Sequence, residues 1–234
     1  MQFKESYQRI LNENGLQKYA TEELAERFSV LSDRLIEFNS HVNLTAITDP
    51  EEIILRHFAD CLAAADAFPK GAKVLDVGCG GGFPCLPLSI ARPDLVVTGL
   101  DSTAKKLVFV ENTALEMGLN LKTVVGRAEE LGHGEMRESF DVVTARAVAA
   151  LNVLLEWCLP FLKVGGYMIA LKGSGGKEEL EAAKNAVKVL GGGDVSIEEY
   201  MLSDMGRSLI VIRKLRPTPS QYPRPNGKIK KKPL

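Results

Sequence analysis

The chain is 234 residues long, enough for one domain with a buried core and a modest extension. Its composition, 45% hydrophobic and 25% charged, excludes wholesale disorder, and no apolar run reaches the roughly 18 residues of a membrane helix. The net charge of −1 argues against a protein that coats DNA or RNA through bulk positive charge. The first residues are charged and lack the apolar stretch of a secretory signal, so we expect a cytoplasmic protein with no membrane partner.

The four cysteines do not have the spacing of a metal or redox motif. Cys61, Cys79, Cys85 and Cys158 include no CxxC pair, and cysteines in a reducing compartment are mostly small buried side chains. We therefore expect neither a disulfide nor a metal ion.

Residues 1–68 are predicted to form a helical N-terminal extension. Thr21, followed by two glutamates, has the pattern of an N-cap and first turn, and apolar residues then recur at helical spacing as far as Phe38. Asp49 followed by Pro50 repeats the start signal and indicates a second helix that continues to Leu62.

Residues 69–216 change to short β-branched runs that alternate with helical stretches. The apolar runs lie in KVLDVG, DLVVTGLD, LKTVVG, FDVVTA, GYMIALK and SLIVIRK, and the helices between them are predicted over 83–91, 103–118, 148–162 and 177–190. This alternation is typical of a doubly wound, mostly parallel sheet, whose buried strands read as continuous apolar runs. We expect an α/β domain of this class.

Residues 217–234 are rich in proline and in basic residues. From residue 213 to the end there are eight lysines and arginines and no acidic residue. Such a segment cannot build a core of its own, so we expect it to be exposed, either free or draped over the domain. A solvated, solubilising segment is one interpretation, but eight cations without an acid favour binding to an RNA backbone. The candidates are Arg224, Lys228, Lys230, Lys231 and Lys232.

A glycine-rich turn after the first predicted strand carries the chemistry. It reads Asp76-Val-Gly78-Cys-Gly80-Gly-Gly-Phe83-Pro84 and leads from a strand into a helix. Glycines let the backbone approach a ligand, and the helix start offers unpaired N–H groups. Dinucleotide-binding folds use the same kind of turn, so the glycines alone do not name the ligand. The next strand ends at Asp101, where an acid can accept hydrogen bonds from ribose hydroxyls.

A turn of this form, with an acid on its entering strand, resembles that of the class I methyltransferases, which use S-adenosylmethionine. The acid suits the positive sulfonium and ammonium groups of that cofactor, which the helix dipole alone would oppose. An NAD-linked oxidoreductase and a glycine turn without a ligand are the alternatives. The resemblance implies a Rossmann-like domain with a seven-stranded, mostly parallel sheet.

Longer blocks are similar to one family within this class. They are HVNLTAI at 41–47, RHFADCL at 56–62, DVGCGGGFPCLPLSI at 76–90, LDSTAKKLVFVE at 100–111, GRAEE at 126–130, FDVVTARAVA at 140–149, ALKG at 170–173 and the ending PRPNGKIKKKPL. Over nearly the whole chain they resemble the bacterial small-subunit ribosomal RNA methyltransferase G family, once called glucose-inhibited division protein B.

The resemblance implies transfer of a methyl group from S-adenosylmethionine, which leaves S-adenosylhomocysteine, to N7 of one guanine in the decoding-region loop of 16S ribosomal RNA, of the position-527 type. The substrate would be 16S ribosomal RNA or the 30S particle, and we expect a monomer. N7 carries a lone pair and no proton, so positioning suffices without an acid or a base. The alternative is a non-catalytic module that binds RNA or the ribosome on a nucleotide-binding fold.

Four candidate cofactor contacts lie on the turn. Gly78 and Gly80 allow close approach of the backbone. Phe83 is either an apolar wall or a core residue. Asp76 either binds the ammonium group of the cofactor, directly or through water, or caps the glycine turn.

Four more candidates follow the next two strands. The resemblance places Asp101 and Ser102 at the ribose end, although Ser102 could also be an ordinary helix cap. It places Ala128 and Glu129 beside the adenine, with a backbone N–H and a carboxylate as partners for the ring.

Four basic or titratable residues complete the predicted site. Arg146, just past the fourth strand among small and apolar residues, is expected to pair with the cofactor carboxylate or an RNA phosphate; a surface ion pair is the alternative. The resemblance places Arg56 and His57 near the cofactor mouth, though a lone histidine is more often structural. Lys172, at the end of the fifth strand, is a candidate phosphate contact.

Overall fold

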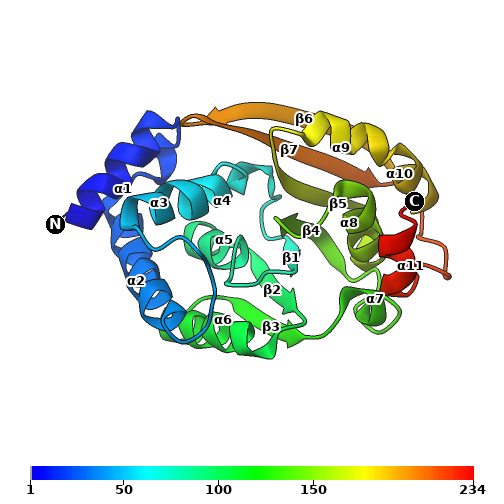
Figure 1. The fold of residues 1–234 in the computed structure, drawn as a ribbon, viewed down its shortest axis with the longest axis horizontal. Helices are drawn as coiled ribbons and strands as arrows, with labels where there is room; N and C mark the ends of the chain where they lie inside the picture. The colour runs from blue at the N-terminus through cyan, green and yellow to red at the C-terminus, as the bar shows by residue number, and fades with distance from the viewer. Residues whose placement is uncertain (1) are drawn as a thin grey trace.

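Seven strands form one sheet in the order β3-β2-β1-β4-β5-β7-β6 in the computed structural model, which describes residues 2–234 (Figure 1). β7 pairs antiparallel with β5 and β6, and the other neighbours pair in parallel. The strands are β1 Lys73–Val77, β2 Val96–Asp101, β3 Leu121–Val125, β4 Phe140–Arg146, β5 Leu162–Gly173, β6 Gly192–Leu202 and β7 Met205–Lys214. The predicted α/β class with a seven-stranded, mostly parallel sheet is confirmed.

Helices cover both faces of this sheet. They are α1 Gln2–Glu13, α2 Glu22–Asn39, α3 Pro50–Ile53, α4 Asp60–Leu62, α5 Cys85–Ala91, α6 Ala104–Glu116, α7 Ala128–Leu131, α8 Leu151–Cys158, α9 Gly176–Ala182, α10 Lys184–Val189 and α11 Asn226–Lys231. α5 and α6 pack directly on one face, and the N-terminal helices α1 to α4 belong to the same apolar core. α8 to α10 pack on the other face, with α7 and α11 against α8 (Figure 1). Neighbouring residues of β1 show why: Val74 belongs to one apolar core and Leu75 to the other, because successive strand residues point to opposite faces.

The N-terminal helices begin where the sequence predicts. The Thr21 side chain accepts the backbone N–H of Leu24 at 3.2 Å, and Asp49 accepts that of Glu52 at 3.0 Å, so both N-caps are confirmed. The second helix runs from Pro50 to Leu62 with a π-helical stretch, η2, at Ile54–Ala59 in its middle. None of the helices within residues 2–234 is long and apolar enough to cross a membrane.

β6 and the helix predicted over 177–190 differ from the predicted pattern. β6 does not correspond to any of the six predicted apolar runs. It is a sheet-edge strand that begins with glycines, and most of its other side chains are exposed. Such a strand lacks the continuous apolar run of a buried strand. The helix predicted over 177–190 is divided at Ala183 into α9 and α10.

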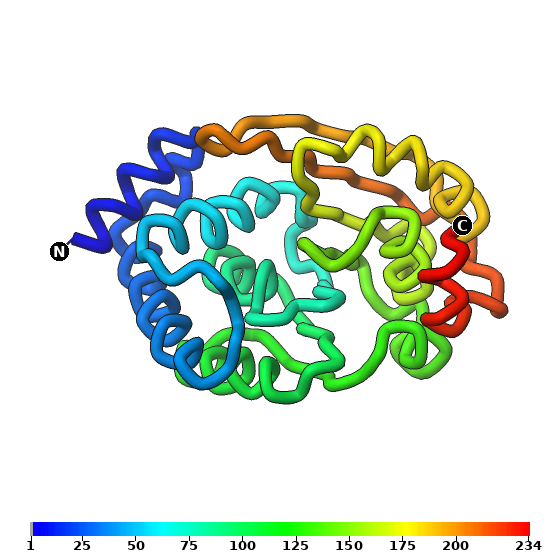
Figure 2. Tube along the Cα trace, in the orientation of Figure 1, coloured from blue at the N-terminus to red at the C-terminus, as the bar shows by residue number. Residues whose placement is uncertain are grey.

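The tail is draped over the domain, and most of its residues are exposed, but some of them are buried against the domain. Thr218 and Ile229 are buried, and Arg137 donates to the carbonyls of Thr218 and Tyr222 at 2.7 and 2.8 Å. Figure 2 shows the C-terminal end of the tube, in red, against the segment of α8. The prolines do prevent an independent core, but the tail completes the core beneath α8 instead.

Candidate cofactor and substrate site

The glycine-rich turn joins β1 to α5 and is held by the end of β2. Gly78 and Gly80 have φ of 73° and 54°, left-handed values that favour glycine. Asp101 accepts the backbone N–H of Gly80 at 2.9 Å through one oxygen and that of Thr103 at 2.8 Å through the other. The predicted ribose acid therefore also fixes the turn and the start of α6.

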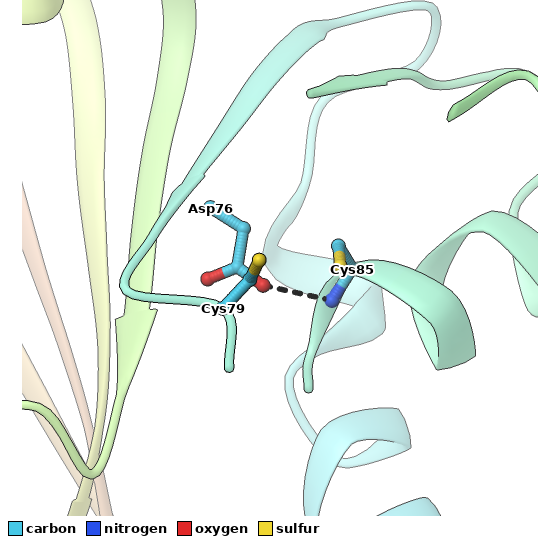
Figure 3. A group of neighbouring side chains, drawn as sticks. All are labelled: Asp76, Cys79 and Cys85. Atoms are coloured by element: carbon cyan, nitrogen blue, oxygen red, sulfur yellow. Dashed lines mark hydrogen bonds between the residues drawn. The ribbon is translucent and has the colours of Figure 1, made fainter. Parts of the chain in front are cut away.

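Asp76 caps the first turn after the glycines from a fully buried position. One of its carboxylate oxygens accepts the backbone N–H of Cys85 at 2.9 Å, as the dashed line in Figure 3 shows. The other oxygen, Oδ1, has no hydrogen-bond partner within the described chain. Burial raises the pKa of Asp76 to about 7. Of the two roles predicted for Asp76, the structure shows the capping one.

Two cysteines stand beside this carboxylate. Cys79 and Cys85 are buried, and their sulfurs and an Asp76 oxygen lie within 4.8 Å of one another (Figure 3). The sequence spacing did not indicate this cluster. Burial raises the pKa of the Cys85 thiol well above its ordinary value. The thiol is therefore protonated and packs beside the turn as a small apolar side chain.

A cavity of about 260 Å³ opens at the ends of β1, β2 and β3. We call it the nucleoside cavity. The predicted cofactor residues that line it are Gly78, Asp101, Ser102, Ala128 and Glu129. Among the lining residues that were not predicted for the cofactor are Trp157, Asn226 and Lys230. Phe83 and Gly80 do not line it; Phe83 is buried and belongs to the core.

A second cavity, of about 630 Å³, adjoins the first. We call it the basic cavity. Both cavities are lined by Ala147 and Val148, the segment that follows β4. The charged residues that line the basic cavity are Arg56, Asp60, Arg146, Lys172, Glu179 and Arg207. Asp60, Glu179 and Arg207 were not among the predicted site residues, because their place in this cavity depends on contacts between distant segments of the chain.

Arg146 has its partners within the protein. Its guanidinium donates to Asp60 at 2.8 Å and to the carbonyl of Arg56 at 2.9 Å, and lies 3.1 Å from Nδ1 of His57. Asp60 also accepts from Arg207 at 2.7 Å. These side chains are mostly buried, so Arg146 forms an internal ion pair rather than the surface ion pair given as the alternative. The contact of Arg146 with the cofactor carboxylate or an RNA phosphate stays a prediction. The Nε of Arg146 has no partner within residues 2–234.

His57 belongs to the same network as a neutral side chain. Burial, with the nearby Arg146 charge, lowers its pKa to about 4. Because an arginine only donates, Nδ1 of His57 must accept, and Nε2–H then donates to Thr45 Oγ1 at 2.8 Å. The ring stacks on Phe83 with centroids 4.5 Å apart. This geometry favours the structural interpretation of His57.

The remaining predicted cations differ in their availability. Lys172 donates to the carbonyl of Ala149 at 2.6 Å and pairs with Glu179 at 2.7 Å. Arg224 is paired with the buried carboxylate of Glu156. Lys228, Lys231 and Lys232 are exposed.

The residues present fit S-adenosylmethionine. Positive-φ glycines, two acids at successive strand ends and an adjoining cavity are grouped at one sheet edge, the edge where ligands bind in open α/β sheets. Five buried side-chain polar atoms within residues 2–234 lack a partner, and three of them belong to residues that line the two cavities, namely Arg146, Trp157 and Asn226. Unpaired buried polar groups are rare and often mark functional sites.

Proteins whose solved structures have the same architecture are named for different reactions. A SAM-dependent O-methyltransferase from Thermotoga maritima is 15% identical, with a TM-score of 0.56 over 78% of this chain and 71% of its own. The [4+2]-cyclase SpnF is 18% identical, with a TM-score of 0.54 over 67% of this chain and 81% of its own. These similarities show the fold, which does not by itself give the reaction.

Sequence relatives are more specific. Ribosomal RNA small subunit methyltransferase G of Lactobacillus johnsonii is 47% identical over 91% of this chain and 92% of its own. The protein of the same name from Oceanobacillus iheyensis is 42% identical over 98% of both. The family model described as rRNA small subunit methyltransferase G matches residues 24–209. The chain therefore belongs to the rRNA small subunit methyltransferase G family.

Proposed function

We propose that the protein methylates N7 of one guanine in the decoding-region loop of 16S ribosomal RNA. Family membership supports the coarser statement, methylation of small-subunit ribosomal RNA, and confirms the predicted cofactor, S-adenosylmethionine. We also infer a cytoplasmic location, where bacterial ribosomal RNA is made. The predicted monomeric state stays a prediction.

The observation that carries the proposal is the pair of adjoining cavities. The nucleoside cavity holds the predicted ribose and adenine residues, and the basic cavity begins at the shared residues Ala147 and Val148. Its volume of about 630 Å³ lies within the range of about 300–1,000 Å³ typical of small-molecule sites. A base turned out of its RNA strand could enter there.

The charges of the basic cavity suit an RNA strand. Its lining holds four cations, Arg56, Arg146, Lys172 and Arg207, against two carboxylates, Asp60 and Glu179. The excess of two positive charges favours a phosphate group. The Asp60 carboxylate fixes both Arg146 and Arg207, so their guanidinium groups are oriented before a substrate arrives.

The histidine beside Arg146 is not arranged to move a proton. The cofactor, when bound, supplies an electrophilic methyl group on a sulfonium. His57 is neutral and both its ring nitrogens have partners, so it holds Arg146 rather than acting as a base. Guanine N7 needs no deprotonation, so orientation by the arginines and exclusion of water are sufficient. These features favour N7 over an exocyclic amine as the acceptor.

The test is methyl transfer with a tritiated donor. Naked 16S RNA and 30S particles from a strain that lacks the enzyme are incubated with methyl-labelled S-adenosylmethionine, and the labelled nucleoside is identified. We expect 7-methylguanosine at a single site in the decoding-region loop. Label on another atom or another base would contradict the N7 assignment. No label on either substrate, without thermal stabilisation by the cofactor, would favour the non-catalytic RNA-binding module.

A further inference from the structure

The C-terminal helix forms part of the nucleoside cavity. Asn226 and Lys230 of α11 line it together with Gly78, Asp101 and Glu129 from the strand ends. The strand ends of the Rossmann-like domain and the C-terminal tail, which are far apart in the sequence, thus line the same cavity. The tail charges suggested RNA binding, yet one of these lysines stands at the predicted adenine end.

Trp157, Asn226 and Lys230 form one wall of the nucleoside cavity. Two polar atoms on this wall have no partner within the described chain. Trp157 Nε1 is a buried donor on a side chain that is only 8% exposed. Asn226 Oδ1 is a buried acceptor. A donor and an acceptor lining one cavity suit a heteroaromatic ring that itself carries both, and the edge of adenine has an amino donor beside ring-nitrogen acceptors.

The wall is firmly attached to the domain. Arg224 donates to both oxygens of the fully buried Glu156 at 2.8 and 2.7 Å, and its backbone N–H adds a third bond at 2.8 Å. Glu156 precedes Trp157 on α8. His133, just after α7, lies 2.8 Å from the carbonyl of Pro223. The tail is therefore joined to the two elements that carry Trp157 and Glu129.

The movable part of the wall is Lys230. Its side chain is exposed, and its ammonium lies 5.8 Å from the centre of the Trp157 ring, within reach of a cation–π contact. Rotation of an exposed lysine away from the ring opens the wall at little conformational cost.

We propose that the C-terminal segment 222–231 is a wall of the cofactor site, in which Asn226 and Trp157 bind the adenine ring of S-adenosylmethionine and Lys230 closes over it. This rests on the proposed function, because it assigns the nucleoside cavity to that cofactor. The tail then contributes to cofactor affinity directly, separately from any contact that its other lysines make with RNA.

The experiment measures cofactor binding without turnover. Titration calorimetry with S-adenosylhomocysteine is performed on the full chain and on Asn226→Ala, Lys230→Ala and Lys231→Ala. Lys231 is the matched control, since it is an exposed neighbour of Lys230 that does not line the cavity. We expect about tenfold weaker binding for Asn226→Ala, a smaller loss for Lys230→Ala, and wild-type affinity for Lys231→Ala. Equal affinity in all four proteins would overturn the proposal.

A second measurement localises the contact. 5′-Methylthioadenosine has the adenosine but lacks the amino acid end, so Asn226→Ala should weaken it by the same factor. Trp157 is the only tryptophan, so its emission should change on binding, and Trp157→Phe, which removes the N–H and keeps a ring, should weaken both ligands. Losses confined to S-adenosylhomocysteine would contradict the adenine assignment. If the wild type binds neither ligand, the proposed function fails; if it binds both and the variants bind equally, only the tail assignment fails.

Discussion

Two titratable side chains near the site have pKa values shifted in opposite directions by the same cause. Burial disfavours the charged form, which raises the pKa of Asp76 and lowers that of His57. The native protein therefore binds more protons than the unfolded chain at Asp76 and fewer at His57. Between about pH 4 and 6.5 their effects on stability oppose each other, so each needs its own variant to be seen.

Asp76 should destabilise the fold as the pH rises. Its pKa is raised from 3.8 to about 7, so its contribution is fully present below about pH 4 and is lost as the pH rises through 7. The difference in unfolding free energy between the wild type and Asp76→Asn should therefore fall by up to about 4 kcal/mol from pH 4 to pH 8. Urea unfolding across this range measures it, with the exposed Asp33→Asn variant as the comparison. A flat difference between the wild type and Asp76→Asn would mean that the carboxyl of Asp76 titrates normally.

His57 should behave in the opposite way. Its pKa is lowered from 6.5 to about 4, so its stabilising contribution is present above pH 6.5 and is lost as the pH falls toward 4. The stability advantage of the wild type over His57→Gln should shrink by up to about 3 kcal/mol over that interval. The same unfolding series measures it, with exposed His41→Gln as the comparison. An advantage that grows on acidification would show that the native ring is charged.

At the scale of elements, the seating of the tail on α8 depends on one buried ion pair. Glu156 is fully buried and Arg224 is mostly covered. Removing one partner of such a pair leaves an uncompensated charge, so Arg224→Ala should lower the unfolding free energy by about 3–5 kcal/mol. Arg213→Ala is the matched variant, because its contact with Asp194 is 3.6 Å long and exposed on both sides; it should cost less than about 1 kcal/mol. Similar costs for the two variants in urea unfolding would contradict this role of the pair.

The elements show which parts of the protein a sequence can predict. The apolar runs gave six strands because a buried parallel strand carries its own signal, and Thr21 and Asp49 gave helix starts because a cap is a local hydrogen bond. The burial of Ile229 could not be predicted from the charges and prolines of the tail, which are local features. It depends on α8, which is far away in the chain.

The difference between local signals and long-range contacts also applies to the residues of the site. That Asp101 and Glu129 lie at the same edge of the sheet could be predicted, because one ends β2 and the other follows β3; their contacts with the cofactor stay predictions. Asp60 and Arg207 could not, since their ion pair joins residues 147 positions apart. Trp157 and Asn226 likewise meet only through the docking of the C-terminal segment, which no spacing in the sequence records.

At the scale of the whole molecule, the predicted N-terminal extension shares its core with the methyltransferase domain. Within the extension, the rings of Phe28 and Phe58 are 4.8 Å apart. The rings of Phe38 and Phe109 are 5.4 Å apart, and this contact joins α2 to α6 of the methyltransferase domain. Tyr7 and Leu11 of α1 belong to the same apolar core as β1 residue Val74. A chain with one continuous core on this face is expected to unfold as one unit.

Loss of packing in the N-terminal helices should therefore also lower the unfolding temperature of the opposite face of the sheet. Leu11→Ala removes a fully buried side chain, at a cost of about 2–5 kcal/mol, and should lower Tm by roughly 4–20 °C at about 2–4 °C per kcal/mol. Trp157 on α8 reports the far face by fluorescence, and circular dichroism reports the helices, so both signals should shift together in one transition. Leu115→Ala, on a side chain that is 83% exposed, should leave both within about 1–2 °C. If circular dichroism loses amplitude in a separate earlier step while the Trp157 transition stays in place, the extension is an independent unit rather than part of a shared core.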